Sequence, residues 1–311
     1  MTDLSPATIT SDAAADQPDD GRAKRNVWVL AAAQGLGGLA TMNIFATAAL
    51  AGAQLAPDAR WATLPVSTYI IGTALTTYPA SMFMQRYGRR AGFMLGALGG
   101  LIGSLLAAYA ILRGDFALFC LATFIAGSHQ AFAQYYRFAA TDVASPGFAP
   151  KAVSYVLAGA LVGALFGPLI INHTRDLFAP VLFAGNYAAT AALLAVSMGV
   201  LAFIDLPKPQ AERPAATPFG ALLRRKRLLV AMLAGMMAYG MMNLLMTATP
   251  LAMVGCGLSP DQASWVIQWH VLAMFAPSFF TGALIVRYGA ERIIAIGLLL
   301  NDAAALAGMT G

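Results

Sequence analysis

Long apolar stretches alternate with short segments rich in charge, proline or glycine along most of the chain. Each stretch is close to the length of about 20 residues that an α-helix needs to cross the hydrocarbon core of a membrane. Inside lipid a helix satisfies its own backbone groups, whereas an isolated strand does not. The pattern therefore predicts an all-α polytopic membrane protein. Nine spans are expected, at Val27–Leu50, Ala62–Met84, Ala91–Leu112, Phe116–Phe138, Ala152–Ile171, Val181–Ile204, Leu228–Pro250, Trp265–Ile285 and Ile293–Thr310.

The composition also favours a membrane protein and excludes a soluble one. Of the 311 residues, 59% are hydrophobic and 11% are charged, and the mean hydropathy is +0.68. A soluble domain carries about 25% charged residues, so this chain has too few to cover a surface in water. It contains no nucleophile–base pair, phosphate-binding loop or zinc-type cluster. We therefore expect no enzymatic activity and no cofactor.

The cysteines and the net charge add little further chemistry. Cys120 and Cys256 lie far apart in different segments, which gives neither a disulfide framework nor a metal-type spacing. The net charge of +5 comes without a basic cluster of the nucleic-acid-binding type. As partners we expect the lipid bilayer and a small transported solute but no nucleic acid, and we expect a monomer.

The basic residues indicate the orientation, because cytoplasmic loops carry an excess of Lys and Arg. With the N-terminus inside, sixteen of the 19 basic residues fall on the inner side and three on the outer side. The outer three are Arg60, Arg113 and Arg175. We therefore expect a multi-pass protein of the bacterial inner membrane with a cytoplasmic N-terminus.

Two segments outside the spans complete the expected domain organisation. The first 21 residues contain five aspartates and no basic residue. This composition predicts that residues 1–26 form a disordered cytoplasmic tail rather than a signal peptide. Residues 205–227 are rich in proline and end in a run of four basic residues. We interpret them as a cytoplasmic linker between an N-terminal six-helix half, residues 27–204, and a partial second half, residues 228–311.

A short sequence recurs at equivalent places in these two halves. Arg86-Tyr87-Gly88 follows the second expected span, and Arg287-Tyr288-Gly289 follows the eighth, both on the inner side. Repetition of this kind marks transporters built from two parallel halves. The repeated residues and the basic residues beside them are Arg86, Gly88, Arg89, Arg90, Arg287, Gly289 and Arg292.

These loops resemble the signature G-x-x-x-D-R-x-G-R-R of the major facilitator superfamily of transporters. Ser81 stands at the first glycine, and Gln85 and Val286 stand where that family has an acidic residue. The resemblance therefore does not extend to the ion network that this acidic residue supports. The resemblance implies a fold of twelve spans, of which the nine expected here would be a C-terminally truncated form.

The fifth expected span contains Gly159, Gly163 and Gly167 at every fourth position, followed by Pro168. Small residues at this spacing let helix backbones approach closely, which is the packing interpretation. The stretch also resembles the Gly-Pro motif of proton-coupled drug antiporters, in which case Pro168 would shape a gate. Both interpretations stay open.

Methionine and histidine gather in the seventh and eighth expected spans. Met242 and Met246 are four residues apart and share a helical face, as do His270 and Met274. Thioethers and imidazole suit Cu(I) better than hard cations. The four residues resemble the ligands of the CcoA-like copper importers of the superfamily, and the stretch after them resembles both those importers and the related riboflavin importers. The alternative is that these methionines fill gaps in helix packing.

Further polar residues fall inside expected spans. Gln130, Gln134 and Arg137 share one face of the fourth span, where they either form hydrogen bonds between helices or line a cavity for solute or protons. Asp302 is a carboxylate within the ninth span. Because ionisable groups inside a membrane are costly, Asp302 is a candidate proton relay.

Together these features favour a secondary transporter, with copper uptake across the inner membrane as the first candidate. One alternative is proton-coupled transport of riboflavin, another organic solute or a drug. The other is a truncated remnant that no longer transports. A purely structural membrane protein would leave His270, Asp302 and the repeated loop without an explanation.

Overall fold

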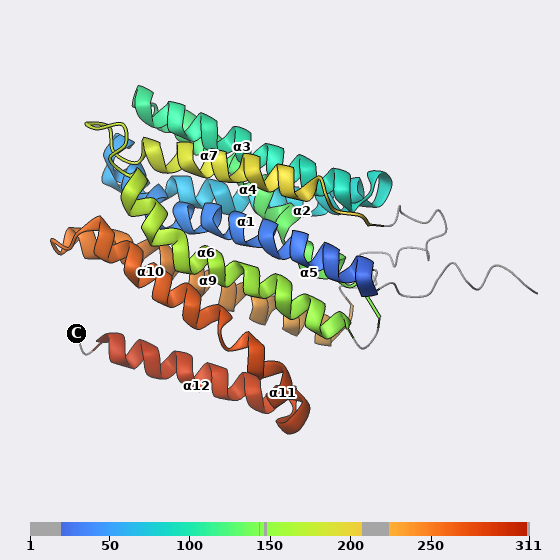
Figure 1. The fold of residues 1–311 in the computed structure, drawn as a ribbon. Coiled ribbons are helices and arrows are strands. Elements are labelled where there is room, and N and C mark those ends of the chain that lie inside the picture. Colours follow the sequence, from blue (N-terminus) through green and yellow to red (C-terminus); the bar gives the residue numbers. More distant parts are fainter. Residues whose placement is uncertain (1–19, 143, 146–147, 207–223, 310–311) are drawn as a thin grey trace, which may run out of the picture.

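A computed structural model describes residues 20–142, 144–145, 148–206 and 224–309. This part of the chain is helical and contains no strand, which confirms the expected all-α class. Most of its long helices lie side by side in a bundle (Figure 1). The helices are α1 (Asp20–Leu55), η1 (Ala59–Trp61), α2 (Leu64–Tyr87), α3 (Arg89–Arg113), α4 (Phe116–Ala133), α5 (Tyr136–Ala139), α6 (Ala149–Thr174), α7 (Ala184–Leu201), α9 (Lys226–Gly255), α10 (Pro260–Phe275), α11 (Ser278–Tyr288) and α12 (Ala290–Met309).

The ends of several helices fall where a side chain or a glycine satisfies the free backbone groups. Asp115 accepts a hydrogen bond from the backbone N–H of Leu118 and caps the start of α4. Ser259 and Gln262 form a capping box at the start of α10. α3 ends at Gly114, whose φ of 69° lies in the left-handed region that glycine adopts without strain. Local sequence therefore fixes these turns independently of the packing around them.

The central helix of the bundle is α1. It packs along α6 and α7, while α4 packs along both α2 and α3. α9 lies against α1, and α10 lies against α6, α9 and α1. α12 packs on α11 at some distance from the bundle (Figure 1). Every residue of α1 from Met42 to Ala51 is buried, so this part of the helix is surrounded by neighbours on all sides.

Six helical segments of the described chain are long and apolar enough to cross a membrane: α1, α3, α4 together with α5, α6, α7 and α9. The chain is therefore a multi-pass membrane protein. α2, α10, α11 and α12 occupy the remaining expected spans and are not among these six segments. The count of nine spans stays a prediction.

Two expected spans are interrupted. The expected span Trp265–Ile285 divides into α10 and α11, with Pro277 at the break, because proline has no N–H to continue the hydrogen bonds of a helix. The expected span Phe116–Phe138 divides into α4 and the short α5 at Gln134-Tyr135. The apolar pattern of the sequence therefore did not indicate either division.

The last part of the segment expected as a disordered tail is helical, because α1 begins at Asp20. Arg22 and Arg25 both pair with the carboxylate of Asp205, at 2.7 and 3.0 Å. The side chain of Asn26 exchanges hydrogen bonds of 2.7 and 3.0 Å with the backbone of Asp205. The tail prediction is wrong for these residues, since contacts with the segment after α7 hold them in the helix.

The expected linker and most of the expected tail lie outside the described residues. Residues 1–19 and 207–223 belong to the part that is not described, and the chain resumes at Arg224, shortly before α9. The division into residues 1–26, 27–204, 205–227 and 228–311 therefore stays a prediction.

Glycines let α6 lie directly against α1. A Cβ atom on Gly159 would come within 2.1 Å of the carbonyl oxygen of Ala31, and one on Gly163 within 2.9 Å of the backbone of Gly38. Both obstacles are backbone atoms, which cannot turn aside as a flexible side chain can. The spacing of these glycines is therefore accounted for by the close approach of two backbones.

The remaining residues of this motif lie farther along the same helix. A Cβ atom on Gly167 would come within 2.6 Å of Cγ of Met42, a side-chain atom. Pro168 follows it, yet α6 continues as one helix to Thr174. In this conformation Pro168 does not end the helix, and its role in a gate stays a prediction.

We predict that Gly159→Ala destabilises the bundle, because the added methyl group meets the backbone of Ala31. Overpacking of this kind costs about 1–3 kcal/mol. The measurement is the thermal unfolding of the purified protein in detergent. Gly199→Ala in α7 is the matched control, since nothing lies within 4 Å of its Cβ position, and it should unfold at or slightly above the wild-type temperature. Equal loss of stability in both variants would contradict the importance of the α1–α6 approach.

Candidate functional site

We call the helices α1–α7 the first bundle. α9 meets this bundle along only one part of its length. Every residue from Val230 to Met241 is exposed, whereas Asn243 and Met246 are buried. Met246 belongs to the same apolar core as Met42 and Phe45 of α1. α9 therefore contacts α1 through the C-terminal halves of both helices. The N-terminal half of α9 stands free of the described bundle.

Uncharged polar side chains of α1, α2 and α4 meet close to this contact. Thr41 Oγ1 donates to Gln130 Oε1 at 3.0 Å, and the hydroxyl oxygens of Thr41 and Tyr69 lie 3.4 Å apart. We call Thr41, Tyr69 and Gln130 the polar cluster. It joins α1, α2 and α4 of the bundle.

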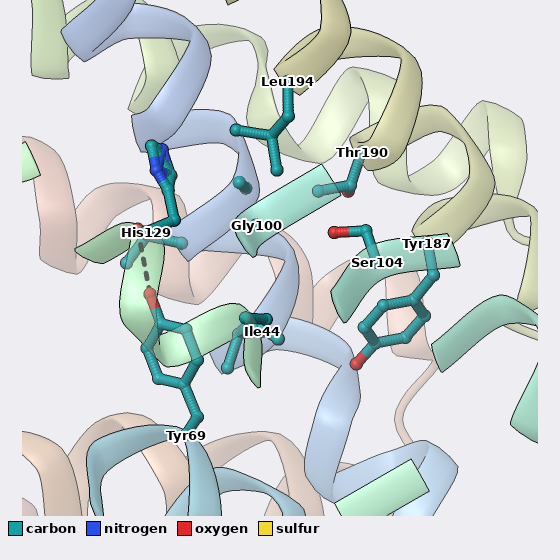
Figure 2. Close-up of a pocket in the computed structure, with 11 residues that line it drawn as sticks. Ile44, Tyr69, Gly100, Ser104, His129, Tyr187, Thr190 and Leu194 are labelled. Carbon is teal, nitrogen blue, oxygen red and sulfur yellow. Dashed lines mark hydrogen bonds between the residues drawn. The ribbon is translucent and has the colours of Figure 1, made fainter. Parts of the chain in front are cut away.

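A small pocket adjoins the polar cluster inside the first bundle, between α1, α2, α3, α4 and α7 (Figure 2). Its free volume is about 10 Å³, which is room for about one water molecule. Figure 2 shows the phenol of Tyr69 on the side of His129, with Ser104, Thr190 and Tyr187 across the pocket. In this conformation the pocket suits a water-sized ligand and is too small for an organic solute.

His129 is buried at the edge of this pocket, and within the described residues neither of its ring nitrogens has a hydrogen-bond partner. Gly37 on α1 and Gly100 on α3 leave room for it, because a Cβ atom on either would come within 2.9 and 2.8 Å of its side chain. Helical spacing indicated its neighbour Gln130, together with Gln134 and Arg137, and not His129. The space for this imidazole comes from Gly37 and Gly100, which lie on other helices. Helical spacing along α4 therefore gives no sign that His129 is buried.

The two other members of the predicted polar face do not join the cluster. Gln134 is exposed, and so is Arg137, whose guanidinium lies 5.1 Å from the centre of the Phe138 ring. Gln134 directly follows the end of α4 at Ala133, and its backbone N–H still bonds the carbonyl oxygen of Gln130. Exposure of both side chains, and not a lost helical turn, keeps them out of the cluster.

The four predicted copper ligands divide between buried and exposed positions. Met246 is buried, and Met242 packs half-buried against the same apolar core. His270 is half-buried, with a buried Nε2 that has no partner among the described residues. Met274 is 38% exposed. The structure therefore places the first pair on the inward face of α9 and leaves the last methionine at the surface.

Asp302, the candidate proton relay, is exposed on α12. This helix packs on α11 and lies apart from the bundle (Figure 1). The structure does not bring Asp302 to the polar cluster, and its role in proton transfer stays a prediction.

The two Arg-Tyr-Gly loops adopt the same turn. Gly88 and Gly289 each separate two helices, with φ angles of 90° and 85° that favour glycine. In each loop the arginine guanidinium lies over the ring of the tyrosine that follows, at 5.3 Å for Arg86 and 5.2 Å for Arg287. The repeated sequence thus encodes a repeated local structure.

An acidic residue does face the first of these loops, although Gln85 stands at the acidic position of the signature. Arg89 donates to the carboxylate of Asp142, which follows α5, at 2.9 Å. Burial raises the pKa of the Asp142 carboxyl, and the charge of Arg89 opposes that shift. The ion pair ties the loop between α2 and α3 to the segment between α5 and α6. Arg90 and Arg292 are exposed.

An ion pair at the opposite end of the bundle joins α6 to α10. Arg175, directly after α6, contacts the carboxylates of both Asp176 and Asp261. Nearby, Gln268 Nε2 donates to the carbonyl oxygen of Leu165 at 2.8 Å. The sequence analysis used Arg175 only as a marker of orientation. It missed the pair because Arg175 and Asp261 are 86 positions apart and no motif connects them.

Sequence comparison now identifies the family. Residues 29–310 match the profile described as Major Facilitator Superfamily. The chain belongs to the Major Facilitator Superfamily (MFS). As a member of this superfamily it is a membrane transporter of a small solute and not an enzyme.

Two relatives of this MFS chain are informative. It is 43% identical over 293 residues to the riboflavin transporter RfnT of Brucella anthropi, a match that covers 93% of the chain and 74% of RfnT. It is 30% identical over 310 residues to the uncharacterized MFS-type transporter YdeG of Bacillus subtilis, covering 92% of the chain and 70% of YdeG. Neither name refers to copper.

We predict that Asp261→Asn loosens the contact between α6 and α10 in this MFS protein, because it removes the charge that Arg175 holds across the two helices. Partly exposed ion pairs contribute about 0.2–1 kcal/mol, so local opening should become roughly 1.4- to fivefold more frequent. The measurement is hydrogen–deuterium exchange of the backbone amides at the start of α10.

Asp176→Asn is the matched control, because it removes the other carboxylate on Arg175 and leaves the pair to Asp261 in place. Exchange in this variant should stay at the wild-type level. If the two variants exchange alike at the start of α10, the pair does not hold the helices together.

Proposed function

We propose that this protein carries riboflavin, or a closely related flavin, across the bacterial inner membrane. The observation that carries the proposal is the identity of 43% with the riboflavin transporter RfnT, over 93% of the chain. The match covers nearly all of the described helices, including those that supply the polar cluster. We expect the protein to work as a monomer, with proton coupling as the source of energy.

The chemistry of the polar cluster supports a neutral aromatic solute. Thr41, Tyr69 and Gln130 offer hydroxyl and amide groups and no charge. A flavin ring carries an imide edge that both donates and accepts hydrogen bonds, and its flat face stacks on aromatic side chains such as the exposed Tyr239. We propose that the imide edge meets the cluster where α9 faces the first bundle.

Copper uptake, the first interpretation of the sequence, has weaker support. A Cu(I) path through Met242, Met246, His270 and Met274 needs all four donors to face one cavity, and Met274 is exposed while Met246 is packed in the apolar core. Methionine fills irregular gaps in helix packing. We assign Met242 and Met246 this packing role, and copper becomes the competing outcome in the test of transport.

The orientation belongs to the proposal as well. We propose a cytoplasmic N-terminus, since the basic residues are concentrated on the side of the Arg-Tyr-Gly loops. We predict that reporter fusions after Pro57 and after Gln210 report opposite sides of the membrane, with Gln210 inside. The readout is a pair of reporters, one active only in the cytoplasm and one only outside it. Both sites on one side would refute this orientation.

We predict that the protein, expressed from its complete reading frame, supports uptake of labelled riboflavin in a bacterium that neither makes nor imports this vitamin. Gln130→Leu should lower uptake about two- to tenfold, because an uncharged hydrogen bond contributes about 0.5–1.5 kcal/mol. Met246→Leu is the matched control, since it keeps the volume of the side chain and removes the thioether.

The same cells are tested for copper accumulation. The flavin proposal expects wild-type and Met246→Leu cells to take up riboflavin alike and neither to accumulate copper above the empty host. Copper uptake that Met246→Leu abolishes, without riboflavin uptake, would overturn the proposal in favour of the metal.

A further inference from the structure

His129 of α4 is an ionisable side chain enclosed by the helices of the first bundle. It is 4% exposed, and neither ring nitrogen has a hydrogen-bond partner among the described residues. A Cβ atom on Gly37 would come within 2.9 Å of its Nε2, and one on Gly100 within 2.8 Å of its own Cβ. Both α1 and α3 therefore pack directly on this side chain.

Packing alone does not explain a histidine at this position. An apolar side chain of similar volume would fill the same space without burying two polar nitrogens, which is the costlier arrangement. Ionisable groups inside membrane segments are rare for this reason, and those that occur commonly belong to substrate or proton pathways. The burial of His129 therefore indicates a chemical role for its imidazole.

The residues that line the pocket beside His129 include no charged side chain (Figure 2). Each helix packed around it supplies a hydroxyl group instead: Thr41 of α1, Tyr69 of α2, Ser104 of α3, and Tyr187 and Thr190 of α7. α4 itself contains no Asp, Glu, Lys or Arg. The two phenols stay protonated at neutral pH, whereas imidazole ordinarily gains and loses a proton between about pH 5 and 8. Among the groups lining this pocket, His129 is therefore the one suited to exchange a proton near neutral pH.

The same pocket connects His129 to the polar cluster. Thr41 and Tyr69 belong to both, and Gln130, the third member of the cluster, is the next residue of α4. The pocket has room for about one water molecule, enough to pass a proton between the imidazole and the surrounding hydroxyl groups. A solute at the cluster would therefore contact groups that also surround the imidazole.

We propose, on the basis of the flavin uptake proposed above, that His129 binds and releases the proton whose gradient drives transport. A charged imidazole without a counterion or hydrogen-bond partner is costly to bury, so the enclosed ring carries only the one proton of its neutral form. When α1 or α3 moves off the ring, water reaches it and gives a second proton to the free nitrogen. The ring returns this proton to water before the helices close again, which links each protonation to a movement of the bundle.

The first test separates accumulation from exchange, using the protein expressed from its complete reading frame and reconstituted in liposomes. With an inward gradient of about one pH unit, the wild type should accumulate labelled riboflavin up to about tenfold, for one proton per solute. His129→Gln keeps a donor and an acceptor but gains no proton at these pH values. It should lose the response to the gradient and still exchange labelled for unlabelled riboflavin, because exchange needs no net movement of protons. A merely structural role would impair both activities together.

The other two histidines of the chain serve as controls. His173 is exposed near the end of α6, and His173→Gln should respond to the gradient as the wild type does. His270 has a buried Nε2 without a partner among the described residues, which makes it the competing position. A response lost in His270→Gln and kept in His129→Gln would overturn the assignment.

The outcomes separate the proton site from the proposed solute. A wild type that exchanges no riboflavin contradicts the flavin function. A wild type that exchanges riboflavin but does not respond to the gradient contradicts the proton site alone, and so does a His129→Gln protein that accumulates riboflavin as the wild type does.

A second test follows the proton without any solute. In the variant His173→Gln/His270→Gln, His129 is the only histidine of these 311 residues, and its NMR signal in bilayers with nitrogen-labelled histidine is the one lost on the further change His129→Gln. The ring should gain its second proton as the pH falls from about 8 to about 5. An imidazole that stays neutral over this range would overturn the proposal, whichever solute the protein carries.

Discussion

The approach of two backbones, those of α1 and α6, is the constraint on which the rest of the structure depends. Lipid tails are as apolar as the side chains of a membrane helix, so close packing and not the hydrophobic effect holds such helices together. Gly159 and Gly163 let α6 touch the backbone of α1 at Ala31 and Gly38. Because α1 is fixed there, α7, α9 and α10 pack against a helix whose position is already set.

The position of α1 in turn sets the polar chemistry. Thr41 lies one turn beyond Gly37, where α1 passes α4 closely enough for Thr41 to bond Gln130 and for Gly37 to contact His129. A buried polar atom without a partner costs about 1–3 kcal/mol, and His129 has two such nitrogens in the described structure. The hydrogen bond from Thr41 satisfies Gln130 but does nothing for His129. Two neighbouring residues of α4 therefore differ: the amide of Gln130 has a partner, and the imidazole of His129 has none among the described residues.

Sequence periodicity predicted the helices well, because each apolar run is a local property of the chain. It did not foresee that Pro277 divides an expected span. It also did not foresee that Gln134 and Arg137 are exposed and take no part in the cluster of Gln130. It also selected the inward pair Met242 and Met246 by spacing alone. Spacing does not separate a metal ligand from a packing residue, and burial in the apolar core favours packing here. Contacts such as Arg175 with Asp261 depend on tertiary structure and have no trace in the sequence.

The repeated Arg-Tyr-Gly loops show where the meaning of a motif comes from. Gly88 and Gly289 impose the same turn, and the arginine before each lies over the following tyrosine in the same way. The surroundings nevertheless differ, because in the described part of the chain the first loop has Asp142 to pair with Arg89, whereas the arginines of the second loop have no such ion pair. The carboxylate absent at Gln85 is thus supplied from another segment. A motif fixes a local backbone geometry, and the helices packed around it decide which charge it meets.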